Sequence, residues 1–197
     1  MHILGLNAYH GDASAALFVD GQLSSAMEEE RFSRLKHQAG FPSQAVRHAL
    51  RHGGLAASDI GHIAVSRDSH AHLHKKLMFA LSKGPSLSLL RDRLTNASKL
   101  RDVRTSVAEA AGVDEAELHA DVHRVEHHRA HMASAFFVSP FERAALLSID
   151  GFGDFVSTMW GTGCGTRLTV DGWVEFPHSM GLLYTAITQY LGFTKYR

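Results

Sequence analysis

Two short motifs in the second half of the sequence constrain the fold most. The first is Glu126-His127-His128-Arg129-Ala130-His131, and the second is Asp150-Gly151-Phe152-Gly153-Asp154. The apolar run at 144–149 precedes the second motif and predicts a buried strand that ends at Asp150. Gly151 and Gly153 allow the chain to turn tightly and to approach a phosphate or another ligand closely. The sequence therefore predicts a strand, a carboxylate and an anion-binding turn, in that order.

The same strand–turn–strand order occurs near the N-terminus. Residues 2–8 and 13–20 have strand patterns around a turn that contains Asp12, and Asp20-Gly21 indicates a hairpin to a third strand at 22–28. Taken singly, each turn can be an ordinary structural turn. Two such units are how actin-like ATPase folds hold phosphate, and the turns at Asp12 and at 150–154 are candidates for such a pair.

The other elements follow from helix signals and from hydrophobic periodicity. Ser43 is expected to cap a helix that ends at Gly53-Gly54, and residues 28–37 are too charged for the core and too short for an independent helix. A helix is expected at 127–137, with its core side formed by Ala130, Ala133, Ser134 and Phe137. Further strands are expected at 60–66, 123–126, 144–150, 155–161, 167–171 and 174–177, and a last helix at 181–191.

Residues 69–112 form a distinct stretch with two helical segments around 83–86. Its basic side chains are Lys75, Lys76, Lys83, Arg91, Arg93, Lys99, Arg101 and Arg104. One interpretation is a solvated helical insertion. The other is a lid, or a surface that binds an anionic acceptor.

The two motifs together predict a metal site. On a helix, His127 and His131 lie one turn apart on the same face and can share one ion with Asp150. Two nitrogen ligands and one oxygen ligand suit iron, zinc or manganese rather than magnesium. His128 is an alternative ligand, and Glu126 is a candidate to orient an imidazole. The competing interpretation is a pair of histidines that only hydrogen-bond to carbonyl groups.

Arg34 and Lys36 are candidates to contact a phosphate or a carboxylate. Their alternative role is a surface ion-pair cluster with the preceding glutamates, which contributes little to stability. Cys164 is interpreted as structural, and the serines do not form a nucleophile-elbow pattern.

Composition excludes several classes of protein. The chain has 197 residues, of which 45% are hydrophobic and 20% charged, and this suits one globular domain or a little more. The formal net charge of zero gives no indication of nucleic-acid or membrane-surface binding. A single cysteine fits a reducing cytoplasm, and we see neither a signal peptide nor an apolar run of the roughly 18 residues that a membrane helix needs. The abrupt end after the last helix leads us to expect a fragment of a longer protein.

At the level of motifs, the chain resembles the carbamoyltransferases of antibiotic and nodulation-factor biosynthesis. The blocks that carry the resemblance cover nearly the whole chain outside 69–112. They are 4–7 (Leu-Gly-Leu-Asn), 12–17, 28–37, 126–131 with 134–136, 148–154 and 184–193.

The resemblance implies an α/β chain with an actin-like, ribonuclease-H-like fold, of the type also seen in the threonylcarbamoyl-transfer protein of tRNA modification. It implies carbamoyl transfer from carbamoyl phosphate, with ATP, through a carbamoyl-adenylate to an acceptor hydroxyl of a small molecule. The adenylate would be made in a second domain that, like a fourth metal ligand, lies beyond this chain. By position, His127, His131 and Asp150 match metal ligands, with iron preferred over zinc or manganese. Asp12 and Lys36 match the adenylate or acceptor cleft.

The sequence offers candidates, but no single assignment, for the general base and for the substrate-binding residues. His10 and Asp12 are the candidates for the base that deprotonates the acceptor hydroxyl, although Gly11 separates His10 from the matched block. Arg34, Lys36, Gly151 and Gly153 are the candidates for substrate binding. The rival functions are an actin-like sugar kinase and a non-catalytic fragment that binds nucleotide or metal.

Overall fold

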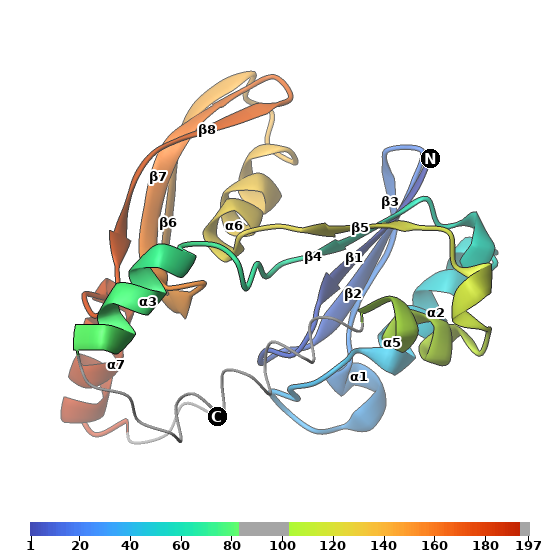
Figure 1. Cartoon of the computed structure of the whole chain (residues 1–197), viewed down its shortest axis with the longest axis horizontal. Coiled ribbons are helices and arrows are strands. Elements are labelled where there is room, and N and C mark those ends of the chain that lie inside the picture. Colours follow the sequence, from blue (N-terminus) through green and yellow to red (C-terminus); the bar gives the residue numbers. More distant parts are fainter. Residues whose placement is uncertain (83–102, 194–197) are drawn as a thin grey trace. The chain divides into compact units, whose positions relative to one another are not determined.

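The computed structural model describes residues 1–82 and 103–193, which fall into two compact units (Figure 1). The first unit comprises Met1–Ser66 and Lys83–Arg124, and the second comprises Arg67–Ser82 and Val125–Arg197. The first contains β1 (His2–Asn7), β2 (Ser14–Val19), β3 (Gln22–Glu28), α1 (Glu30–Ser33), α2 (Ser43–Gly53), a 3-10 turn (Ala57–Asp59), β4 (His62–Val65), α5 (Val103–Ala111), a 3-10 turn (Glu115–Glu117) and β5 (Asp121–Arg124). The second contains α3 (Leu73–Ser82), α6 (His127–Phe136), β6 (Arg143–Gly153), β7 (Val156–Cys164), β8 (Arg167–Glu175) and α7 (Met180–Tyr190).

The first unit is built on one five-stranded sheet with the order β3-β2-β1-β4-β5. Strands β1, β2 and β3 form an antiparallel meander, and β4 and β5 continue the sheet in parallel with β1. An antiparallel meander that leads through a helix into parallel strands is the arrangement expected for a subdomain of an actin-like fold. The predicted fold class is therefore confirmed.

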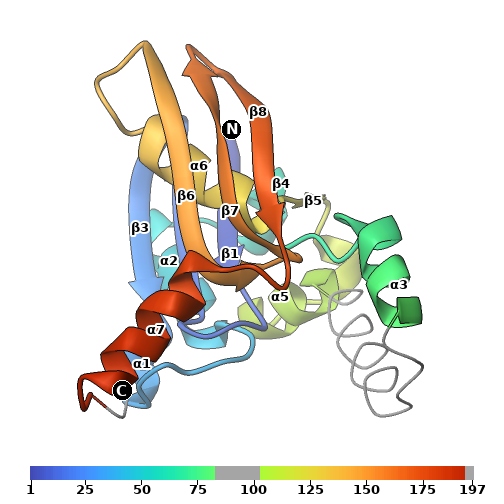
Figure 2. The same ribbon diagram turned by 90° about the vertical axis from the view of Figure 1, so that its left-hand side faces the viewer.

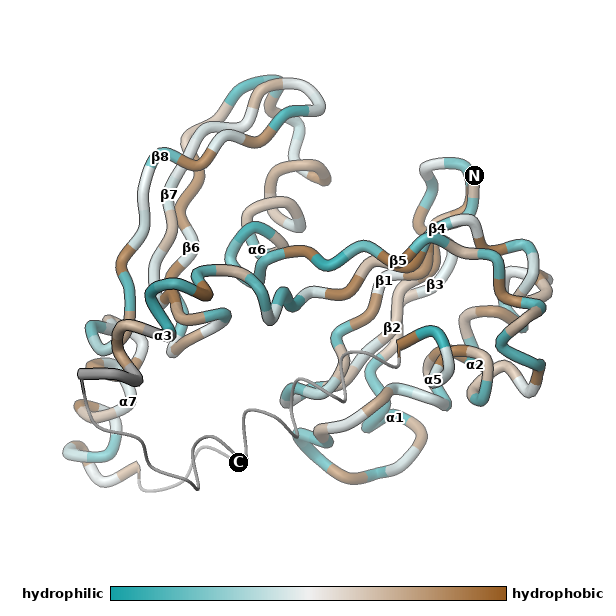
Figure 3. Tube along the Cα trace, in the orientation of Figure 1, coloured by the Kyte–Doolittle hydropathy of each residue, from teal (hydrophilic) through white to brown (hydrophobic). Residues whose placement is uncertain are grey.

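Alternation along the strands explains the core of this unit. In β1, Leu4 and Leu6 are buried, and in β4 the buried residues are Ile63 and Val65. Successive side chains of a strand point to opposite faces, so these residues line one face of the sheet. Helices α2 and α5 pack together on that face (Figure 1), and Figure 3 shows the apolar colouring of β1 and β4.

The N-terminus of α2 differs from the prediction. Ser43 does not act as a side-chain cap. Instead, the Glu29 carboxylate accepts hydrogen bonds from the backbone N–H groups of Gln44, at 3.0 and 3.1 Å, and Ala45, at 2.9 Å. Glu29 is only 3% exposed, although we expected the acidic run to be too charged for the core. Its charge is compensated because free N–H groups and the positive end of the helix dipole surround it.

The basic stretch also requires a correction. Helix α5 is not a solvated insertion, because Val103, Val107, Ala108 and Ala110 are buried in the core of the first unit. Arg104 donates to the carbonyl groups of Leu118 and Ala120, at 3.1 and 2.7 Å. Lys75 forms an ion pair with Glu175, and Lys76 donates a hydrogen bond to the Ser69 carbonyl. The remaining basic residues, at 83–101, lie outside the described residues.

The second unit is an antiparallel sheet of β6, β7 and β8 with α6 against one face (Figure 2). Helix α6 begins at the predicted residue, but its buried face is His128, Met132 and Phe136. Ser134 and Phe137, expected in the core, are exposed. The prediction built the core side from other residues and did not include His128, which is buried with both ring nitrogens hydrogen-bonded.

The two strands expected at 167–171 and 174–177 are a single strand, β8. The pairing partners of Trp160 and Gly161 are Gly172 and Val170, so Asp171, which we expected to end the first of these strands, forms a bulge within the single strand. A Cβ atom at Gly172 would lie 2.3 Å from the Trp160 ring, so a larger residue there requires that ring to move. In the described ranges, no helix combines the length and the apolar composition needed to cross a membrane.

The role of Glu29 predicts an asymmetry within the acidic run. Glu29→Ala leaves the first N–H groups of α2 buried without an acceptor, so the free energy of unfolding is expected to fall by about 1–3 kcal/mol. Glu28→Ala, which breaks an exposed ion pair with Arg31, is expected to change it by less than about 0.5 kcal/mol. Urea denaturation measures both. Equal losses in the two variants would contradict the capping role.

Candidate metal centre

The helix start and the strand end that carry the predicted ligands are both well defined. Glu126 is the N-cap of α6, and its carboxylate accepts a hydrogen bond from the Arg129 N–H at 2.8 Å. This cap makes His127 the first residue of the helix and puts His131 one turn later. Strand β6 extends to Gly153, and Asp150 lies in its irregular part, between the pairing of Ile149 with Thr158 and that of Gly153 with Val156.

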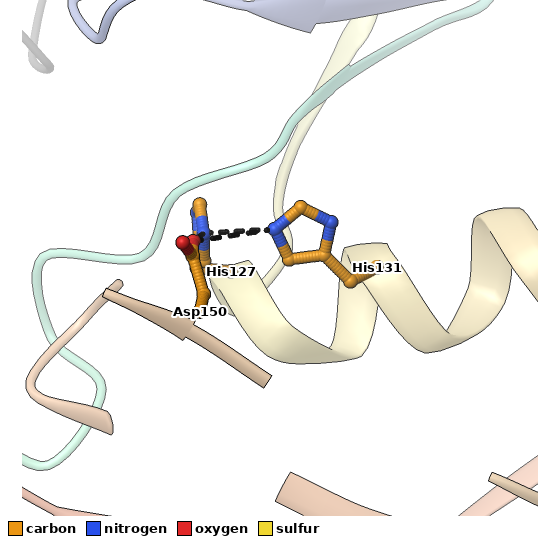
Figure 4. A group of neighbouring side chains, drawn as sticks. All are labelled: His127, His131 and Asp150. Atoms are coloured by element: carbon orange, nitrogen blue, oxygen red, sulfur yellow. Dashed lines mark hydrogen bonds and ion pairs between the residues drawn. The ribbon is translucent and has the colours of Figure 1, made fainter. Parts of the chain in front are cut away.

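The three predicted ligands converge on one point (Figure 4). His127 Nε2 lies 2.8 Å from Asp150 Oδ2, and His131 Nε2 lies 3.0 Å from His127 Nε2. The distance from His131 Nε2 to Asp150 Oδ2 is 3.6 Å. Within residues 1–82 and 103–193, this is the one group of three or more His, Cys, Asp or Glu side chains whose ligand atoms all lie within 4.8 Å of one another.

Hydrogen bonding alone satisfies this cluster poorly. The Nε2 atom of His127 carries either one proton or one lone pair, yet it faces both a carboxylate oxygen and a second imidazole nitrogen. One N–H would have to serve both partners. A cation would instead accept a lone pair from each of the three atoms. Ligand atoms at about 2.1 Å from a metal are roughly 3.0–3.5 Å apart, which lies within the observed range. The residues therefore fit a metal.

The charge states also suit metal binding. Burial is the main cause that lowers the pKa of His131, and the neighbouring His127 adds to this effect while Asp150 opposes it. For Asp150, burial acts to raise the pKa, but hydrogen bonds from His127 and the Gly151 N–H, with the charges of both histidines, lower it overall. A neutral imidazole and an ionised carboxylate are the forms that bind metal.

Two alternatives for the neighbouring residues are wrong. His128 is not available as a ligand, because its Nδ1 lies 2.8 Å from Ser148 Oγ and its Nε2 lies 2.9 Å from the Val156 carbonyl oxygen inside the core. Glu126 caps the helix through Oε2, and its buried Oε1 has no hydrogen-bond partner among the described residues, so it does not orient an imidazole ring.

The two glycines of the second motif have different surroundings. A Cβ atom at Gly153 would lie 1.9 Å from Cδ2 of His127, so this glycine allows the His127 ring to lie against the strand. A Cβ atom at Gly151 would meet nothing within 4 Å. The Gly151 N–H donates to Asp150 Oδ1, and its carbonyl accepts from the Ser179 hydroxyl. The predicted contact of these glycines with substrate stays a prediction.

The other predicted site residues lie in the first unit. Asp12 has a φ of +58°, and its Oδ1 accepts a hydrogen bond from His37 Nδ1 at 2.8 Å. The Asn7 side-chain amide holds the turn by donating to the carbonyls of Gly11 and Asp12. His10 forms an isolated bridge with Gly40.

Arg34 and Lys36 are exposed and lie two positions apart, just before His37. Arg34 ends α1 in the left-handed conformation. In the part of the chain that the structure describes, the ion pairs of the acidic run go to Arg31. The structure therefore brings Asp12 next to the 34–37 segment through His37, a residue that the sequence analysis did not single out.

Asp154 was also missed, although it closes the second motif. Its Oδ2 accepts hydrogen bonds from the His127 N–H at 3.0 Å and from the Asp68 N–H at 2.8 Å. Nothing local in the sequence indicates partners so far away. The only signal is that the motif contains a second acidic residue, Asp154, four positions after Asp150.

Comparison with known proteins establishes the family. A sequence model described as Carbamoyltransferase N-terminus matches residues 2–197. The chain therefore belongs to the carbamoyltransferase family, which confirms the resemblance noted from its motifs.

Individual relatives extend well beyond this chain. The chain is 36% identical to the uncharacterized protein sll1178 of Synechocystis over 98% of its own length and 32% of that protein. It is 35% identical to the nodulation protein NolNO of Sinorhizobium fredii over 95% of its length and 26% of that protein. The chain thus spans about a third or less of these curated relatives. Among solved structures, YeaZ from Pseudomonas aeruginosa has a TM-score of 0.44 and 18% identity, covering 90% of this chain and 69% of that one.

The contrast between the two glycines gives a prediction. Gly153→Ala must displace the His127 side chain from its present position, so the affinity for Zn²⁺ is expected to fall at least about tenfold. Gly151→Ala is the matched control and is expected to bind Zn²⁺ as the unmodified protein does. Isothermal titration measures the affinities, and thermal unfolding checks that both variants are folded. Unchanged affinity in Gly153→Ala would contradict the geometry.

Proposed function

We propose that this chain forms the metal-holding N-terminal part of an O-carbamoyltransferase. The reaction would move a carbamoyl group, derived from carbamoyl phosphate and ATP through a carbamoyl-adenylate, to a hydroxyl of a small acceptor molecule. The observation that carries the proposal is the convergence of His127, His131 and Asp150 in a chain of the carbamoyltransferase family.

His127, His131 and Asp150 would hold one divalent cation, with iron preferred and zinc or manganese as alternatives. When bound, such an ion acts as a Lewis acid toward a carbonyl or phosphoryl oxygen. The chain's own contribution is to fix the three ligand atoms before the metal arrives. Helix α6 and strand β6 would achieve this, because both pack on the same small core.

We assign Asp12, in preference to His10, as the base that removes the proton of the acceptor hydroxyl. Its carboxylate is exposed, and the His37 ring N–H fixes one of its oxygens. Both residues have positive φ, at +58° and +54°, and such backbone conformations of non-glycine residues cluster at functional sites. Lys36 and Arg34, in the same segment as His37, would supply positive charge for a phosphate. In the second unit, the turn at Gly151 and Gly153 would contact substrate.

The metal centre gives the first functional prediction. Replacing His127 and His131 together by alanine removes two of three ligands. We expect the full-length protein to lose its bound metal and its rate of carbamoyl transfer to fall by at least about 100-fold, the scale of one lost electrostatic contact to a transition state. Metal content by elemental analysis and transfer from carbamoyl phosphate and ATP are the two measurements.

The matched control is His52→Ala, which removes an exposed histidine at the end of α2 and is expected to change neither quantity. If the double variant keeps both metal and transfer, the histidines are structural, and the proposal fails.

Asp12 gives a second prediction, with a close control. Asp12 and Asp20 both have positive φ, which asparagine tolerates, so replacement by asparagine tests the carboxylate and leaves the backbone unstrained. Asp12→Asn is expected to lower kcat for transfer about 100-fold with little change in KM, because a proton acceptor is lost. Asp20→Asn is expected to leave kcat unchanged. A fall in both variants, or in neither, would remove Asp12 from the proton transfer.

A further inference from the structure

The hairpin between β6 and β7 closes with two residues in unusual conformations. Gly153 pairs with Val156, so Asp154 and Phe155 form a two-residue turn. Their φ values are +50° and +79°. A type I′ hairpin turn requires positive φ at both positions, and Asn-Gly or Asp-Gly usually supply it. A bulky phenylalanine in the second position is a strained choice, and such strain persists only when surrounding contacts fix it.

Those contacts are present on both residues. The Phe155 ring lies against Phe79 and Phe176, with ring centroids 6.0 and 5.7 Å apart. The Asp154 carboxylate accepts two backbone N–H groups, from His127 and from Asp68, and both go to the same oxygen, Oδ2. Ring packing thus fixes Phe155, and the two hydrogen bonds to its carboxylate fix Asp154.

The hydrogen bond to His127 reaches the first residue of α6. The first N–H groups of a helix have no partner within the helix and depend on outside acceptors. The Glu126 carboxylate accepts a hydrogen bond from the Arg129 N–H, and the Asp154 carboxylate accepts one from the His127 N–H. A negative charge at this helix end is also favoured by the helix dipole. Asp154 therefore fastens the helix at the residue that supplies a ligand atom.

The same hairpin carries Asp150, only four residues earlier. The ring of His127 lies against Gly153, between these two acids in sequence. A bond from Asp154 to the backbone of His127 consequently fixes the helix relative to the strand that carries the third ligand atom. The bond from Asp154 to Asp68 ties the segment that leads into α3 to the same point.

We propose that Asp154 is a positioning residue of the metal centre, which sets the distance between His127 and Asp150 by holding the backbone of His127. This inference rests on the metal centre proposed above. Asp154 acts through the backbone of His127, and an exchange of its carboxylate for an isosteric amide therefore distinguishes this role from that of a charged ligand.

The test compares three variants of the purified protein in titrations with Co²⁺, whose visible absorption reports both affinity and ligand geometry. Asp154→Ala removes both hydrogen bonds and is expected to weaken Co²⁺ binding about 10- to 100-fold and to alter the spectrum. Asp154→Asn keeps a carbonyl oxygen that can accept both N–H groups, so binding within about threefold of the unmodified protein is expected. Asp171→Ala, which removes a carboxylate from β8 elsewhere in the sheet, is expected to change neither affinity nor spectrum.

The outcomes separate the possible failures. A purely structural loss would lower the fraction of binding sites but leave the affinity and spectrum of the remaining sites unchanged, and would overturn the positioning role. Equal weakening in Asp154→Asn and Asp154→Ala would assign the effect to charge and would also overturn it. If the unmodified protein binds no Co²⁺, or binds it equally well without His127 and His131, the proposed metal centre itself fails.

Discussion

The buried histidine of α6 decides which way that helix faces. His128 has a hydrogen-bond partner for each ring nitrogen, Ser148 on β6 and the Val156 carbonyl on β7. Leaving either nitrogen unpaired in the core would be costly, so the helix is held in one rotation about its axis. Each residue turns a helix by about 100°, which directs His127 and His131 roughly 120° away from the buried face, toward the end of β6.

A second constraint then sets how closely the helix and the strand approach. Gly153 leaves room for the ring of His127, and Asp154 holds the backbone of the same residue. All of these groups lie between residues 126 and 156, in one helix and one hairpin of the second unit. The candidate centre is therefore built from contacts that are local in sequence, and its geometry is largely set by a small part of the fold.

This locality explains what the sequence could predict. The strand before Asp150, the helix from His127 and the i, i+4 relation of the histidines are properties of short windows, and they predicted the cluster that the structure brings together. The errors arose where a side chain has a distant partner. Glu29 caps a helix that starts more than a dozen residues later, α5 is buried by elements far from it, and Asp154 bonds to Asp68 across the chain. Periodicity contains no information about such partners.

The three consecutive glutamates at 28–30, which lead from the end of β3 into α1, illustrate how much depends on connection length. Glu28 pairs with Arg31, Glu29 lies under α2, and Glu30 accepts the His37 N–H. Deletion of any one of the three would leave two glutamates in the sequence. It would nevertheless move a different carboxylate to the start of α2, or leave the first N–H groups of α2 without an acceptor. The connection from β3 to α1 is thus expected to tolerate a change of charge at its exposed first position far better than a change of length, and sequence alignments should treat this run as three separate positions rather than as an acidic patch.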